Sequence, residues 1–121
     1  MTTQARQPIG VFDSGIGGLT VFREIMSLLP HENLIYFGDT ARVPYGTKSA
    51  ETVRQYSVQI ARFLHTKRIK MLVVACNTAS AYSITLLQRL FRFPVSGVIN
   101  AGVNAALKKT RTGRIAVIGT E

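Results

Sequence analysis

The sequence predicts an α/β fold in which a doubly wound, mostly parallel five-stranded sheet is flanked by helices in flavodoxin-like order. Five short apolar runs indicate the strands, at residues 9–12, 34–37, 71–75, 95–99 and 115–118. These runs are nearly continuous in hydrophobic residues rather than alternating, as strands covered on both faces require. Segments with helical periodicity separate them, and this alternation of strand and helix is typical of a parallel sheet.

Four helices are expected between the strands. The first should end before Pro30, and the second should begin after an N-cap at Thr47 or Ser49. The third should cover residues 77–91 and the fourth residues 101–109. The apolar faces of the first two helices step by three or four residues and consist of Leu19, Phe22, Met26 and Leu29, and of Val53, Tyr56, Ile60 and Phe63.

Length and composition predict one globular domain over residues 9–121, preceded by a flexible segment at residues 1–8. No apolar run approaches the roughly 18 residues of a membrane span, and the polar N-terminus does not resemble a secretion signal, so a cytoplasmic location is expected. The chain stops directly after its fifth expected strand, close to a ligand-binding edge. We therefore expect it to be truncated.

The net charge of +9 raises the question of a nucleic-acid partner, because clustered Lys and Arg can neutralise phosphates. Nine of the 15 basic residues, however, fall at or just after expected helix ends, where cations complement the helix dipole. These are Lys67, Arg68, Lys70, Arg89, Arg92, Lys108, Lys109, Arg111 and Arg114. They belong to the rim opposite the ligand edge, which disfavours nucleic-acid binding as the function of the site.

Ligands of such folds bind where the carboxyl ends of the strands meet the loops, here at residues 13–18, 38–46, 76–78 and 119–121. The first loop places Asp13, Ser14 and three glycines between a strand and a helix, so backbone N–H groups can approach an anion. A plain tight turn explains the glycines equally well. The spacing matches neither the dinucleotide fingerprint nor the P-loop, which disfavours a nucleotide cofactor.

Cys76 is the sharpest feature, because it leaves a buried strand and enters a helix N-terminus. At that end of the helix dipole a negatively charged thiolate is favoured. Asn77 and Thr78 supply polar groups beside it, and Asp13 leaves a neighbouring strand at the same edge, where it could exchange a proton with the thiol although its charge opposes thiolate formation. The alternative is a small buried hydrophobe.

The second loop, residues 37–46, offers hydrogen bonds to a small polar ligand from Tyr45 and Gly46. Arg42 is either a carboxylate fork or a solvated surface cation. A signalling domain that accepts a phosphoryl group would need several acidic residues at this edge. Asp39 and Asp13 are the only candidates for such a cluster. One cysteine and two dispersed histidines do not give the ligand spacing of a metal site.

Three motifs together resemble the glutamate racemases, within the wider group of aspartate, glutamate and hydantoin racemases. They are F-D-S-G-I-G-G-L-T at residues 12–20, Y-F-G-D-T-A-R-V-P-Y-G at 36–46 and V-V-A-C-N-T-A-S at 73–80. The resemblance runs from about residue 9 to residue 121. The combination of the D-S-G-I-G-G and P-Y-G loops is more similar to glutamate racemase than to aspartate racemase.

The resemblance implies cofactor-independent interconversion of L- and D-glutamate by two cysteines, without metal, pyridoxal phosphate or nucleotide. Cys76 matches the thiol that removes the α-proton of the D-enantiomer, and Asp13 matches the acid near it. Six positions match residues that contact the substrate: Asp13, Ser14, Tyr45, Gly46, Asn77 and Thr78. The resemblance also implies a homodimer that supplies D-glutamate for peptidoglycan, and hence for cell wall biogenesis and cell shape.

The second catalytic cysteine of such enzymes lies in a Cys-Thr-His segment of a second, similar domain, and this sequence has no such segment. The resemblance therefore implies that the chain alone is inactive. Two other classes stay open: an aspartate or hydantoin racemase of the same group, and a flavodoxin-like anion-binding or signalling module.

Overall fold

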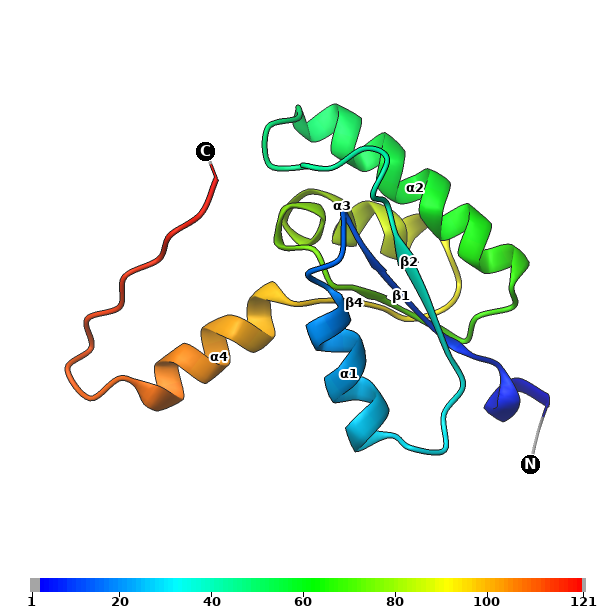
Figure 1. Cartoon of the computed structure of the whole chain (residues 1–121), viewed down its shortest axis with the longest axis horizontal. Coiled ribbons are helices and arrows are strands. Elements are labelled where there is room, and N and C mark those ends of the chain that lie inside the picture. The colour runs from blue at the N-terminus through cyan, green and yellow to red at the C-terminus, as the bar shows by residue number, and fades with distance from the viewer. Residues whose placement is uncertain (1–2, 121) are drawn as a thin grey trace.

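The computed structural model describes residues 3–120 and has an α/β architecture (Figure 1). Four parallel strands form one sheet in the order β2-β1-β3-β4. The strands are β1 (Ile9–Asp13), β2 (Leu34–Gly38), β3 (Met71–Val74) and β4 (Val95–Gly97). The helices are a short 3-10 helix η1 (Thr3–Arg6), α1 (Leu19–Leu28), α2 (Ala50–Thr66), α3 (Asn77–Leu90) and α4 (Ile99–Lys109).

Helices lie on both faces of the sheet, α1 on one and α2 and α3 on the other (Figure 1). Neighbouring side chains of β2 show the two faces directly. Tyr36 meets Phe22 of α1 edge to face at 5.6 Å, and the next residue, Phe37, meets Phe63 of α2 at 5.6 Å. β1 is buried along its whole length because strands flank it on both sides and helices cover both of its faces. This burial accounts for its continuous apolar sequence.

α2 and α3 pack against each other on one face of the sheet. Val53 and Ile60 of α2 are buried, as the apolar stripe predicts, and Leu87 of α3 packs into the same core. A buried hydrogen bond from Ser83 to the hydroxyl of Ser57, at 2.9 Å, crosses this helix pair. Ser49 is the N-cap of α2 and its hydroxyl accepts the N–H of Thr52 at 3.1 Å.

The fifth expected strand is not formed, so the five-stranded sheet is a wrong prediction for the described chain. Residues 115–118 are an exposed extended segment, with Val117 89% and Ile118 98% exposed. A strand exists only where a neighbour completes its backbone hydrogen bonds. Here α4 points away from the sheet, and the chain beyond it turns back at a distance from the short edge strand β4 (Figure 1). The apolar run alone does not reveal that separation.

Two helices bury their apolar faces only in part. Neither α1 nor α4 contains a buried residue among those described, although the stripe of α1 is apolar as predicted. Within the described part of the chain, no helix is long and apolar enough to cross a membrane.

The N-terminal segment is anchored from residue 5 onward. The ammonium of Lys70 donates to the carbonyl of Ala5 at 2.8 Å, and Asn33 donates to the carbonyl of Arg6 at 3.1 Å. The flexibility expected of residues 1–8 stays a prediction, and its first two residues lie outside the described part of the chain, as does Glu121 of the expected 119–121 edge.

Candidate functional site

A cleft of about 690 Å³ opens at the carboxyl edge of the sheet, between the ends of β1 and β3. Parallel pairing creates this edge: Phe12 lies opposite both Phe37 and Val74, so β1, β2 and β3 end together. Five residues that the sequence singles out line the cleft. They are Asp13, Ser14, Cys76, Asn77 and Thr78.

Asp13 is the last residue of β1 and is only 6% exposed. Its Oδ2 accepts the backbone N–H of Gly18 at 2.7 Å, just before α1 begins, and Ser14 lies 3.5 Å from its Oδ1. A carboxylate is well placed at a helix N-terminus because unpaired N–H groups and the helix dipole both stabilise negative charge there. The loop therefore holds the carboxylate in a fixed orientation at the cleft wall.

Cys76 is the N-cap of α3 and is 6% exposed. Its sulfur accepts the backbone N–H of Ala79 at 3.4 Å, while its carbonyl accepts the N–H of Ser80 at 2.9 Å. Asn77 and Thr78 form the first turn of the same helix, with Asn77 exposed and Thr78 half-buried. The thiol thus meets a backbone donor from α3 and faces the cleft that Asp13 also lines.

Comparison with known proteins decides the family. The sequence profile described as Asp/Glu/Hydantoin racemase matches residues 9–121. The chain belongs to this racemase family. A glutamate racemase of Geobacter metallireducens is 62% identical over 113 residues, and that of Persephonella marina is 57% identical over 113 residues.

Solved racemase structures have the same fold. Glutamate racemase from Aquifex pyrophilus superimposes with a TM-score of 0.90 at 51% identity, over 93% of this chain and 45% of that one. The enzyme from Francisella tularensis, in complex with D-glutamate, gives a TM-score of 0.79 at 50% identity, over 84% of this chain and 39% of that one. This chain spans 42% and 44% of the lengths of the Geobacter and Persephonella relatives, and 93% of its own residues match each.

The racemase fold places Tyr45 away from the cleft. Its side chain is 1% exposed, packs in the core beside Tyr56, and donates its hydroxyl proton to the carboxylate of Asp39. Burial, and then the hydrogen bond to Asp39, hold the pKa of Tyr45 well above its ordinary value. The phenol is therefore committed to Asp39, and only the backbone of residues 45 and 46 is left for a ligand.

Arg42 is likewise engaged by other side chains of the protein. Its Nε lies 2.7 Å from Oδ2 of Asp39, its Nη1 donates to Gln59 at 2.6 Å, and its guanidinium sits 3.8 Å from the ring centre of Tyr56. With three partners it is neither a free carboxylate fork nor a solvated surface cation. Together Arg42, Asp39 and Tyr45 fix the loop after β2.

Gly46 lies against the end of the described chain. A Cβ at this position would come within 2.5 Å of the methyl group of Thr120, so the glycine leaves the space that Thr120 fills. Thr120 also lines a second hollow together with Asn77 and Thr78. The loop after β2 and the start of α3 therefore both lie close to the C-terminal segment.

Sequence reasoning gives too little weight to two side chains, Asp39 and Tyr36. Asp39 is 6% exposed and its N–H donates to the carbonyl of Asp13 at 2.9 Å, which ties the ends of β1 and β2 together. Its position directly after a strand, like that of Asp13, is the signal that could have found it. Tyr36 donates to the carbonyl of Gly15 at 3.0 Å, and burial, followed by the charge of Asp13, raises its pKa.

Removing the hydroxyl of Tyr45 should destabilise the fold in a pH-dependent way. We expect Tyr45→Phe to lower the free energy of unfolding by about 1–3 kcal/mol at neutral pH, because Asp39 then stays buried without that donor. A pKa raised by folding contributes stability below the ordinary tyrosine value of 10.0, and this contribution disappears as pH rises beyond it. The deficit of Tyr45→Phe should therefore shrink above that pH.

Urea unfolding across this pH range checks the prediction, with Tyr82→Phe as the control because Tyr82 is 36% exposed. Equal losses in the two variants, or a deficit that grows with pH, would contradict the assigned role of the Tyr45 hydroxyl.

Proposed function

We propose that the protein containing this chain interconverts L- and D-glutamate without a cofactor, with Cys76 as one of two proton-transferring thiols. The observation that carries the proposal is the position of Cys76: at the N-terminus of α3, in the cleft that Asp13 lines, in a chain 62% identical to a glutamate racemase. The D-glutamate complex of the similar Francisella enzyme supports glutamate as the ligand.

The chemistry needs a base on one face of the α-carbon and an acid on the other. In the D-to-L direction the thiolate of Cys76 takes the α-proton, and a second thiol on the opposite face gives its proton to the resulting carbanion. Each thiol then has the protonation state that the reverse reaction requires. Asp13, held by the Gly18 N–H, would exchange the proton with Cys76 between turnovers.

Substrate binding in this proposal uses the polar groups around the cleft. Ser14, Asn77 and Thr78 present side chains and backbone to the ammonium and carboxylate groups of glutamate, and Asp13 presents its carboxylate. Tyr45 and Gly46 contribute backbone groups only, since the phenol is bound to Asp39.

The opposing thiol and the rest of the pocket belong, in this proposal, to a second α/β domain outside residues 9–121. The order β2-β1-β3-β4 supports a flavodoxin-like arrangement for the domain described here. In the cell the product D-glutamate would supply peptidoglycan synthesis, and the enzyme would act as a cytoplasmic homodimer.

The test is a substrate comparison on the full-length protein and on residues 1–121 alone. Circular dichroism should follow interconversion of glutamate by the full-length protein and none by the shorter chain, because one thiol can serve only one face of the α-carbon. Faster turnover of aspartate or of a hydantoin would assign the protein to another branch of the family. Racemisation by residues 1–121 alone would refute the two-thiol proposal.

A further inference from the structure

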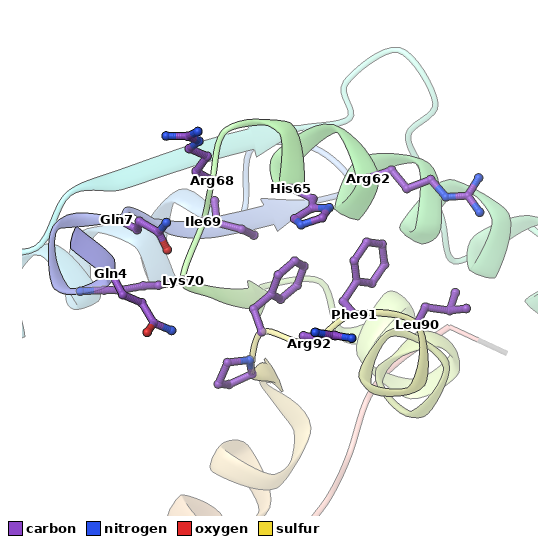
Figure 2. A pocket seen from close by; sticks show the side chains of 12 residues that line it. Gln4, Gln7, Arg62, His65, Arg68, Ile69, Lys70, Leu90, Phe91 and Arg92 are labelled. Carbon is purple, nitrogen blue, oxygen red and sulfur yellow. The ribbon is translucent and has the colours of Figure 1, made fainter. Parts of the chain in front are cut away.

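Another concave site lies at the amino edge of the sheet, opposite the carboxyl edge where Cys76 lies. Its volume is about 660 Å³, within the roughly 300–1,000 Å³ typical of small-molecule sites. The residues preceding β3 and β4 form its floor, and the C-terminal ends of α2 and α3 form its sides (Figure 2). It shares no lining residue with the cleft at Cys76.

The charged residues that line this amino-edge pocket are all cations. Arg62, Arg68, Lys70 and Arg92 line it, and no carboxylate does. Within residues 3–120 the only ion pairs are those of Arg42 with Asp39 and of Lys70 with Glu32. The three lining arginines therefore have no acidic partner in the described chain, and all three are exposed. Figure 2 shows Arg62 and Arg68 at the margins of the pocket, on opposite sides of His65.

Helix dipoles do not fully account for these arginines. The basic residue in the last turn of α2 is His65, and that of α3 is Arg89, whereas Arg68 and Arg92 come after the helices have ended. The final carbonyls of α2 already accept backbone donors, from Lys67 to Leu64 and from Arg68 to His65, each at 2.9 Å. The side chain of Arg68 is thus not needed to satisfy these two carbonyls at the end of α2.

Arg68 also occupies a costly backbone conformation. Its φ of 57° lies in the left-handed region, which glycine adopts most readily at a helix C-terminus. An arginine in this conformation, where glycine would cost less, points to a role for the arginine side chain.

The inner wall of the pocket is aromatic. The rings of Phe91 and Phe93 stack at 5.0 Å with an interplanar angle of 19°, and the ring of His65 lies 6.0 Å and 5.8 Å from them. All three side chains line the pocket, and Figure 2 shows His65 beside Phe91. Flat apolar walls favour a planar ring, while guanidinium groups favour phosphate, which they can bind in a bidentate fashion.

From this arrangement we propose that the amino-edge pocket binds a small phosphate-bearing anion with a planar ring, that is, a mononucleotide. The arginines bind its phosphates and the aromatic wall contacts its base. A mononucleotide fits better than duplex DNA because the cations lie at the margins of a hollow rather than forming a stripe. The site is independent of the racemase proposal, since it uses none of the residues assigned to that reaction.

The experiment measures binding of ADP, pyrophosphate and adenosine to the full-length protein by calorimetry. ADP should bind more tightly than pyrophosphate, and adenosine should not bind measurably. The variant Arg68→Gly/Arg92→Gln should weaken ADP binding by about 100-fold, because each arginine removed takes away a charge-assisted hydrogen bond that contributes about tenfold to affinity. Arg68→Gly also relieves the positive φ, so the melting temperature of this variant should not fall.

Two further variants make the test specific. Phe93→Leu should weaken binding of ADP more than that of pyrophosphate, because only ADP has a ring. Arg89→Gln/Arg111→Gln removes the same charge outside the pocket and should leave ADP affinity unchanged; an equal loss there would mean diffuse attraction and overturn the proposal. Absence of ADP binding would also overturn it, as would duplex DNA binding that depends on Arg68 and Arg92 and exceeds ADP binding.

Discussion

Replacing Cys76 with serine should reduce glutamate racemisation by the full-length protein by about 10²- to 10⁴-fold, the usual contribution of a positioned proton-transfer group. The hydroxyl has nearly the shape of the thiol but is far too weak an acid to supply the base. Serine is also a preferred N-cap residue, so it should keep accepting the Ala79 N–H at the start of α3. The fold should therefore survive while the activity is lost.

A second variant separates the two roles of this side chain. Cys76→Ala removes both the thiol and the cap, so it should be as inactive as Cys76→Ser and less stable by about 0.5–2 kcal/mol. Circular dichroism measures racemisation, and urea unfolding measures stability. Substantial activity in Cys76→Ser would show that another group removes the α-proton and would end the assignment of Cys76.

The strands and the cleft were predictable because their signals are local. Continuous apolar runs mark strands buried on both faces, and parallel pairing brings their carboxyl ends together, so Asp13 and Cys76 were expected at one edge from their positions alone. The helix boundaries followed from equally local signals, such as Pro30 after α1 and Ser49 before α2.

Tertiary partners explain what the sequence did not reveal. Residues 115–118 have the composition of a strand but no neighbour to pair with. Tyr45 and Arg42 belong to a loop with ligand-binding character, yet both side chains are bound to Asp39, which lies six and three residues before them in the chain. Whether a polar side chain binds a ligand or another side chain of the protein depends on how deeply it is buried, and a single sequence does not give that burial.

Gly18 is a backbone position where a small change should have a large structural effect. A Cβ there would lie 2.5 Å from the Cβ of Asp13 and 3.0 Å from the Cβ of Ala75, and neither atom can rotate away. We expect Gly18→Ala to lower the free energy of unfolding by about 1–3 kcal/mol through overpacking. The shift needed to relieve the contact would also separate Asp13 from the Gly18 N–H that now holds it at 2.7 Å.

Gly102→Ala is the matched control, because a Cβ there meets nothing within 4 Å in helix α4. It should raise stability by about 1 kcal/mol through helix propensity. Urea unfolding of both variants, with racemisation assayed in parallel, compares the same added methyl group at a crowded position and at an open one. If Gly18→Ala is as stable as the parent protein, α1 can move relative to β1, and the fixed orientation inferred for the Asp13 carboxylate is wrong. If stability falls as expected, racemisation should fall with it, since Asp13 and Cys76 line the same cleft.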